Sequence, residues 1–223
     1  MRELKIISSE SNSALPISVI VSVMPNRRWF FDKYCLPMII LNNPKEIIIN
    51  DLDGGASMKW NESFRATTQP YVYLCSDDFI IPRDHLSQFL DTLKDSPKNI
   101  GYAYASSYYC FPLDQKNHTI GKNFKFESMD FDIESLKKGN FIDGSCLWKR
   151  DCWVDFDTNL KKLLDWDVAL RNYIENGISG IRVLGSEFLT INLDEGISAK
   201  KNDVGEAIRI VKEKYNLPLN NTL

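Results

Sequence analysis

The stretch Tyr71-Val-Tyr-Leu-Cys-Ser-Asp-Asp-Phe-Ile-Ile-Pro82 decides how this chain is interpreted. Its first five residues are apolar or aromatic and predict a buried strand, which leads directly into Ser76, Asp77 and Asp78. Adjacent carboxylates repel each other and are costly to remove from water unless a cation compensates them. Oxygen ligands of this kind suit Mg²⁺ or Mn²⁺, often shared with a substrate phosphate. The alternative is an acidic turn before a helix whose N-terminus favours Asp.

Two more apolar, β-branched runs precede this stretch, and each is followed by a helical segment. The predicted order is a strand over 17–23, a helix over 29–41, a strand over 46–50, a helix over 57–66 and the strand that starts at Tyr71. Strands and helices that alternate at this spacing predict right-handed βαβ units on a parallel sheet. The sequence therefore predicts an α/β fold with a mostly parallel central sheet flanked by helices.

The rest of the chain adds further elements to the same domain. We expect a helix around 86–93, a strand over 100–106, an irregular excursion over 108–139, a strand over 140–148 with a kink at Gly144, a helix from 160, strands over 181–184 and 187–192, and a last helix over 203–215. No internal repeat or low-complexity linker interrupts the chain. A single domain over 1–223 is the simplest organisation.

Composition excludes several classes of protein. The 223 residues carry 43% hydrophobic and 26% charged side chains and a formal net charge of −3, which gives no reason to expect nucleic-acid binding. The five cysteines lack C-x-x-C spacing, which argues against a zinc site or a disulfide framework. The N-terminus has no secretion signal, and no apolar run approaches the roughly 18 residues that span a bilayer. We expect a cytoplasmic protein without a membrane span.

Polar side chains follow all three strands of the first half. Asn26 and Arg27 follow the first strand, Asp51 and Asp53 the second, and the Asp pair at 77–78 the third. Ligands of parallel sheets bind outside the carboxyl ends of the strands, so these side chains are expected to converge on one site. Polar loops follow every strand, which explains the polarity but not the concentration of acidic groups.

The order of these motifs resembles the inverting glycosyltransferases of family 2, which have the GT-A fold. The matching segments are Val23-Met-Pro-Asn-Arg27, Asp51-Leu-Asp-Gly-Gly-Ala-Ser57, Asn61 with Ala66, Ser76-Asp77-Asp78 in the place of the metal motif, and Leu164-Asp165-Trp-Asp-Val-Ala-Leu-Arg171 in the place of the acidic catalytic region. The resemblance covers about residues 17–192. Each motif is weak alone, whereas five in the family's order are a stronger indication.

The resemblance implies a set of site residues. A nucleotide-diphosphate sugar, with UDP favoured, would be bound by the residues Pro25, Asn26, Arg27, Asp51, Asp53, Asn61, Asp77, Gly144 and Ser145. Mn²⁺ or Mg²⁺ would be held by Asp78, with Asp77 and Asn192 as further candidates. Asp165 would take the proton from the attacking hydroxyl of a glycan, lipid-linked or other acceptor, with inversion at the anomeric carbon. Desolvation beside Trp166 is expected to raise the pKa of this carboxyl.

The sequence also departs from the family pattern. Ser76 replaces the first Asp of the metal motif, Leu164 replaces the Glu of the acidic pair, and Asn192 stands in a late segment where many relatives carry His. Asp165 also has a simpler interpretation, as a helix N-terminal acid or a partner for Lys161 and Lys162. The resemblance implies a nucleotide-binding half over 17–105 and an acceptor and catalytic half over 106–200, and the short chain leaves a module of a larger enzyme open.

Two alternatives use the same features. A sugar nucleotidyltransferase also combines a parallel sheet, acidic groups and Mg²⁺, but it usually has a Gly-rich phosphate loop, and the segment 23–28 has no Gly. A non-catalytic module with this fold would bind the nucleotide or sugar without turnover, consistent with the replaced positions Ser76 and Leu164. P-loop and dinucleotide-binding motifs are absent from the sequence.

Overall fold

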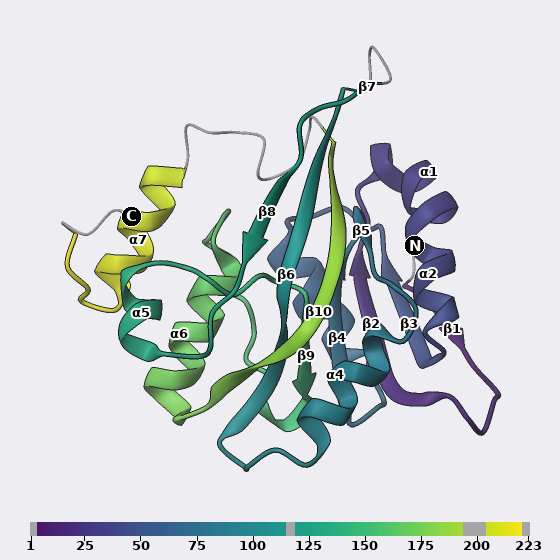
Figure 1. The fold of residues 1–223 in the computed structure, drawn as a ribbon, viewed down its shortest axis with the longest axis horizontal. Helices are drawn as coiled ribbons and strands as arrows, with labels where there is room; N and C mark the ends of the chain where they lie inside the picture. The colour runs from purple at the N-terminus through teal and green to yellow at the C-terminus, as the bar shows by residue number, and fades with distance from the viewer. Residues whose placement is uncertain (1–3, 115–118, 194–203, 220–223) are drawn as a thin grey trace.

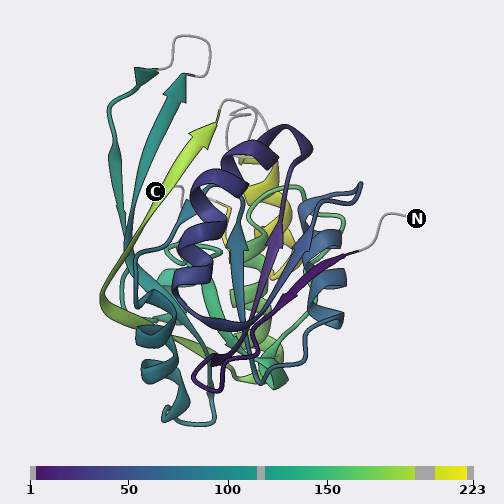
Figure 2. The same ribbon diagram turned by 90° about the vertical axis from the view of Figure 1, so that its right-hand side faces the viewer.

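A sheet with helices on both faces forms the body of the protein in a computed structural model (Figures 1 and 2). The structure describes residues 4–114, 119–193 and 204–219, and this part of the chain holds ten strands in one sheet. The strands are β1 (Lys5–Ser8), β2 (Leu15–Ser22), β3 (Pro44–Asn50), β4 (Tyr71–Ser76), β5 (Phe79–Ile80), β6 (Ile100–Asp114), β7 (Thr119–Ile120), β8 (Phe124–Glu127), β9 (Cys146–Lys149) and β10 (Ser179–Leu193).

The order of strands across the sheet is β1-β3-β2-β4-β9-β6-β10-β5, with β7 and β8 paired to β6. β2 is parallel to β3 and β4, and β6 is parallel to β10. β9 lies antiparallel between β4 and β6, so the five longest strands all run in one direction. Their carboxyl ends therefore meet at one edge, where a ligand site is expected.

The helices form two layers, one on each face of the sheet. They are α1 (Arg28–Phe30) and α2 (Leu36–Leu41), which a π-helical turn over Phe31–Cys35 joins, and α3 (Ala56–Arg65), α4 (His85–Lys94), α5 (Ile133–Lys138), α6 (Leu164–Asn176) and α7 (Val204–Lys214). Helices α1, α2 and α4 pack on one face of the sheet, and α3, α5, α6 and α7 pack on the other.

Strand β2 shows why both faces are covered. Val19 and Val21 belong to the core under α2 and α4, whereas Ile20 belongs to the core under α6. All three side chains are fully buried. A strand buried on both faces is apolar throughout rather than alternating, which is the pattern of this segment. The predicted α/β fold is confirmed, and the predicted strands and helices of residues 15–94 are present.

Four predictions for the second half were wrong in detail. The segment 108–139 is not an irregular excursion, because β6 continues to Asp114, β8 pairs with it and α5 follows. The strand predicted over 140–148 is restricted to β9, and the helix predicted from 160 begins at Leu164. The two short strands predicted over 181–192 are one strand, β10, with an irregularity after Val183 and a positive φ at Gly185.

Some predictions reach beyond the described residues. Residue 203 of the last predicted helix lies outside them, and the helix itself is α7. Residues 115–118 and 194–200 of the predicted second half lie outside them as well. Among the residues that the structure does describe, no helix has both the length and the apolar character needed to cross a membrane.

Candidate active site

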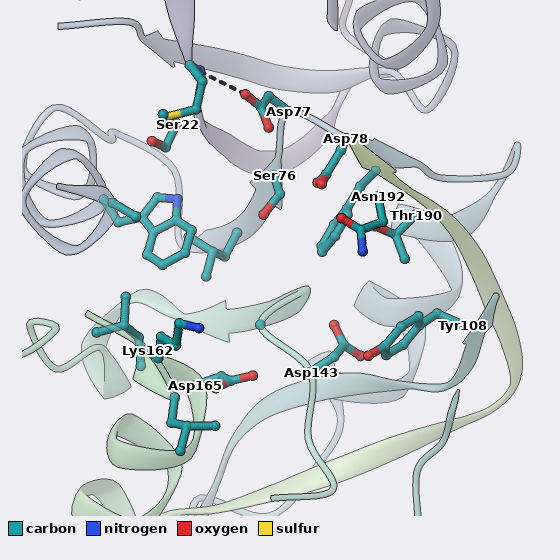
Figure 3. Close-up of a pocket in the computed structure, with 18 of the residues that line it drawn as sticks. Ser22, Ser76, Asp77, Asp78, Tyr108, Asp143, Lys162, Asp165, Thr190 and Asn192 are labelled. Atoms are coloured by element: carbon teal, nitrogen blue, oxygen red, sulfur yellow. Dashed lines mark hydrogen bonds between the residues drawn. The ribbon is translucent and has the colours of Figure 1, made fainter. Parts of the chain in front are cut away.

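A cavity of about 470 Å³ opens at the carboxyl edge of the sheet. Its size is within the range of small-molecule sites in proteins. The ends of β2, β4, β6 and β10 form one part of its wall, and the loop before β9 and the start of α6 form the other. Four aspartates line it in two pairs on opposite walls (Figure 3). We call Asp77 and Asp78 the first pair, and Asp143 and Asp165 the second pair.

Arg27 holds the first pair. Its Nη1 lies 3.1 Å from Asp77 Oδ1 and 3.0 Å from Asp78 Oδ2. Asp77 Oδ2 accepts a second hydrogen bond from the backbone N–H of Met24, at 2.8 Å. The turn after β2 is thereby tied to the end of β4, and one guanidinium compensates two carboxylates.

Burial changes the protonation of the first pair. It raises the pKa of Asp78 to about 7, together with the negative charge of Asp77, while Arg27 opposes the rise. The pKa of Asp77 is also raised by burial, against the opposing effects of the Met24 N–H and Arg27. The guanidinium therefore offsets only part of the free-energy cost of burying two carboxylates at this edge. The remaining negative charge would attract a further cation.

The first pair fits a divalent cation only in part. Within residues 4–114, 119–193 and 204–219, no group of three or more His, Cys, Asp or Glu side chains is placed to hold a metal ion. Each oxygen of Asp77 already accepts one hydrogen bond, from Met24 or from Arg27, which leaves it fewer lone pairs for a cation than a free carboxylate has. Asp78 Oδ2 accepts a hydrogen bond from Arg27, and Asn192 lies beside Asp78 in the cavity (Figure 3). Asp78 and Asn192 offer the oxygen atoms that Mg²⁺ and Mn²⁺ prefer.

Asp165 of the second pair lies in the first turn of α6 and lines the cavity. Its Oδ1 accepts a hydrogen bond from the N–H of Trp166 at 2.9 Å, and the side chain of Asn140 also bonds to it. Burial raises the pKa of this carboxyl, against the lowering effect of both hydrogen bonds. The rise in the pKa of Asp165 is the change expected from the sequence.

Asp143 of the second pair is 7% exposed. Its Oδ1 accepts a hydrogen bond from the N–H of Ser145 at 2.5 Å. Its Oδ2 is buried and receives no hydrogen bond from the part of the chain that the structure describes. Burial raises the pKa of Asp143 to about 8, and the nearby charge of Asp165 contributes to the rise.

A chain of neutral hydrogen bonds holds the loop that carries Asp143. The hydroxyl of Ser145 bonds to the hydroxyl of Tyr73 on β4, which lies 2.9 Å from Nε2 of His85 on α4. Burial lowers the pKa of His85 to about 3, so this ring is neutral at physiological pH. The loop is thus anchored without any charged group.

Six of the residues predicted from the sequence line the cavity. They are Arg27, Asp77, Asp78, Gly144, Asp165 and Asn192. Of the others, Pro25 and Asn26 are exposed in the turn after β2, and Asp53 is exposed after β3. Asp51 forms an ion pair of 2.8 Å with Arg28.

Two predicted residues have tertiary partners instead. The side-chain amide of Asn61 donates to the carbonyl of Phe156 and accepts from its N–H, at 2.9 and 2.7 Å. Ser145 is fully buried and bonded to Tyr73. In this arrangement Asn61 and Ser145 support the walls of the site and do not line it. A role of Asn61 and Ser145 in ligand binding stays a prediction, and it requires both side chains to move when a ligand binds.

The cavity also contains residues that sequence reasoning missed. They are chiefly Asp143, Tyr108 and Thr190, together with Lys161 and Lys162, which had been considered only as partners of Asp165. Figure 3 shows Tyr108 extending toward Asp143, and Lys162 on the same wall as Asp165. The position of Asp143 next to Gly144 was the one available indication, because a Gly in a strand pattern often marks close approach of a ligand.

Solved structures with the same architecture define the class of fold. No protein-family model matches the chain, and no curated protein matches it by sequence. Structure comparison, however, finds glycosyltransferases with the GT-A fold, and the chain has this fold, as the sequence predicted.

Two solved structures illustrate the similarity. The 1–349 fragment of TarS from S. aureus, in complex with UDP-GlcNAc, has a TM-score of 0.61 and 13% identity over 94% of this chain and 68% of that one. The mannosyltransferase PcManGT from Pyrobaculum calidifontis, in complex with GDP-Man and Mn²⁺, has a TM-score of 0.62 and 12% identity over 93% and 67%. At such identities the similarity establishes the fold, and function depends on the site.

Proposed function

We propose that this protein is an inverting glycosyltransferase that moves a sugar from a nucleotide-diphosphate sugar to a hydroxyl acceptor. The observation that carries the proposal is the cavity with two acidic pairs on opposite walls, at the carboxyl edge of a GT-A sheet. A donor placed between the walls would have its diphosphate beside the first pair and its anomeric carbon toward the second. Both similar structures were solved with nucleotide sugars, which supports this donor class.

The first pair would serve the leaving diphosphate. Asp78 and Asn192 would hold a divalent cation, with phosphate oxygens completing its coordination. When bound there, Mn²⁺ or Mg²⁺ supplies positive charge that stabilises the leaving group. Asp77 would keep a structural task, because its two oxygens fix the turn that carries Met24 and Arg27.

Asp165 would accept the proton of the attacking hydroxyl. A carboxylate is a weak base in water, and burial raises the pKa of this one toward the range in which proton transfer is efficient. Attack assisted by one base from the face opposite the leaving group inverts the anomeric configuration. The side chain of Asn140 and the N–H of Trp166 orient the carboxylate for this task.

The proposed donor is a UDP-sugar, and the acceptor is a glycan, lipid-linked or other hydroxyl. TarS with UDP-GlcNAc supports UDP, and PcManGT with GDP-Man makes GDP the first competitor. The alternative is a module that binds a nucleotide sugar without turnover. Leu164 favours it, because this side chain replaces a family carboxylate and is buried in the core.

Calorimetric titration with UDP, GDP, dTDP and CMP, each with Mn²⁺ and with EDTA, tests the proposal. We expect one nucleotide to bind clearly better than the rest, and to lose affinity on chelation. Absence of binding for all four would contradict the donor class. Release of the nucleotide from its sugar conjugate, measured with a panel of acceptors, then separates a transferase from a binding module.

A further inference from the structure

The segment 157–167 carries the base of the proposed reaction and has little regular structure of its own. Every residue from Lys161 to Asp165 lines the cavity. Helix α6 begins only at Leu164, and the residue before it, Leu163, has a φ of 58°. A leucine in this left-handed region is strained, and such strain persists only where the surrounding structure holds it. Contacts from outside the segment must therefore help to fix this part of the wall.

One side chain of the last helix reaches both ends of this segment. The ammonium group of Lys214 on α7 donates to Asp157 Oδ2 at 2.8 Å and to Asp167 Oδ1 at 2.7 Å. The hydroxyl of Tyr215, the next residue, donates to the same Oδ1 at 2.7 Å. Asp157 precedes the cavity residues of the segment, and Asp167 follows them in the first turn of α6. Lys214 therefore fixes the two ends of the segment relative to each other.

Charge strengthens this bridge. The side chain of Asp167 is fully buried, whereas those of Asp157 and Lys214 are 22% and 30% exposed. The hydrogen bond from Lys214 lowers the pKa of Asp157. Burial lowers the pKa of Lys214, but its hydrogen bonds to Asp157 and Asp167 outweigh burial, so this pKa is raised. Lys214 and Asp157 therefore keep opposite charges at neutral pH, and charged hydrogen bonds are stronger than neutral ones.

The bridge does more to fix an arrangement than to attach the helix. Apolar packing already attaches α7, because Ala207 and Val211 are buried and Val211 belongs to the core under α6. An ion pair with a buried partner adds little net stability, since desolvation offsets much of the attraction, and its best-attested use is to specify one arrangement. The arrangement specified here is that of the first turn of α6, where Asp165 lies two residues before Asp167.

We propose that Lys214, together with Tyr215, positions Asp165 for proton transfer. The inference rests on the proposed function and adds two positioning residues to it, although neither side chain lines the cavity. Proton transfer needs the carboxylate within hydrogen-bond reach of the attacking hydroxyl, and a displacement of about 1 Å can lower a rate about a hundredfold. Lys214 and Tyr215 act through Asp167 and the first turn of α6, and they touch no reacting atom.

Hydrogen exchange and kinetics on the full chain test the inference. In Lys214→Met we expect the amides of residues 157–167 to exchange about tenfold faster, measured by mass spectrometry. Calorimetry with UDP and GDP should give affinities within about twofold of native, because the first pair lies on the opposite wall. Release of nucleotide from UDP-GlcNAc or GDP-mannose, measured with the panel of acceptors, should fall about thirtyfold in kcat with little change in KM.

Further variants guard against a folding defect. Lys214→Arg keeps a cation that can bond both carboxylates, and it should return exchange and kcat to within about threefold of native. Tyr215→Phe keeps the ring and removes only the hydroxyl bonded to Asp167, so we expect an intact fold and a smaller loss in kcat, about threefold. Arg209→Met is the matched control and changes neither quantity, because its ion pairs stay within α7.

The outcomes separate this inference from the proposed function. If the native chain releases no nucleotide from either conjugate, both fail. If it does, and Lys214→Met keeps the native exchange of residues 157–167 or the native kcat, the proposed function stands and the role of Lys214 is overturned. The same holds if kcat and the fraction of chain that binds nucleotide fall by one factor, which indicates lost folded protein. Should Lys214→Met not fold, a native kcat in Tyr215→Phe overturns the inference.

Discussion

The two acidic pairs of the cavity are stabilised by different means. Asp77 and Asp78 share the guanidinium of Arg27, whereas Asp143 and Asp165 accept hydrogen bonds from backbone N–H groups and, for Asp165, from Asn140. The first wall is held together by ion pairs with Arg27. Burial raises the pKa values of the carboxyl groups on both walls, and on the first wall the guanidinium of Arg27 opposes the rise.

This difference predicts which substitutions affect the stability of the fold and which affect ligand chemistry. Removing Arg27 from the first wall leaves buried charge without compensation, so the fold itself is weakened. Removing a carboxylate from the second wall takes away a group that costs free energy to bury, so the fold is spared and ligand chemistry is lost. The following four predictions test this contrast, from the largest expected effect to the smallest.

Replacing the base on the second wall should have the largest effect. In Asp165→Asn we expect turnover to fall by about a hundredfold to ten-thousandfold, because the amide cannot accept the proton of the acceptor hydroxyl. Nucleotide affinity and the thermal midpoint should stay near native values. Steady-state kinetics and thermal unfolding provide the two measurements, with Asp151→Asn as control. Turnover within a few-fold of native would place the base elsewhere.

Replacing the cation on the first wall should destabilise the fold. Arg27 and Asp77 are 7% and 4% exposed in their side chains, so Arg27→Met leaves a buried carboxylate uncompensated. We expect a loss of about 3 kcal/mol in the free energy of unfolding, measured with urea. Mn²⁺ should restore part of it by replacing the lost positive charge. Arg83→Met, at an exposed site, is the control. Equal urea midpoints for the two variants would show that Arg27 does not stabilise the fold in this way.

We expect the stability of the fold to depend on pH through His85, which anchors the loop that carries Asp143 by way of Tyr73 and Ser145. His85 has a pKa of about 3 in the folded protein, against about 6.5 when unfolded, so the unfolded state binds the extra proton below pH 6.5. Stability is therefore lost as pH falls from about 6.5, by about 2 kcal/mol at pH 5 from this group. His85→Gln, which cannot gain this proton, should lack that part of the slope. Parallel slopes for the two proteins in urea unfolding would contradict the assignment.

Removing the metal should have the smallest effect. We expect Asp78→Asn, or EDTA with the native chain, to weaken nucleotide binding about tenfold. The two treatments should not add, because both remove the same ion. Asp77→Asn should instead lower the urea midpoint, since Asp77 ties the turn after β2 to β4. Calorimetry measures the loss of nucleotide affinity in Asp78→Asn and with EDTA. Additive losses would mean that Asp78 and the metal act independently.

The first half of the fold was predictable because its signals are local. Strands β2 and β3 are β-branched runs buried on both faces, and the polar residues that follow them could be placed at one edge from the chain direction. The second half was not, because β6 gains its last residues only by pairing with β8 and β10. A segment that mixes Tyr, Phe and Lys shows no period until its partners are known.

The site shows the same limit. Arg27, Asp78 and Asp165 were found from motif order, which is a property of the sequence. Asn61 was expected at the ligand, but its amide is bonded to Phe156, and no sequence pattern announces a partner 95 positions away. Asp143 was missed because its position beside Asp165 in the cavity depends on the tertiary structure, which brings the loop before β9 next to the start of α6.

The irregularity of β10 has a consequence for insertions and deletions. Four positions of β10, from Val183 to Glu187, span the same length as two positions of β6. The excess is an even number, so the alternation of side chains is unchanged beyond it, and Thr190 and Asn192 face the cavity. Deleting Gly185 alone would make the excess odd and turn Leu189 and Ile191 toward the cavity instead. Inserting or deleting two residues in this bend therefore preserves the site. Inserting or deleting a single residue replaces its oxygen atoms with methyl groups.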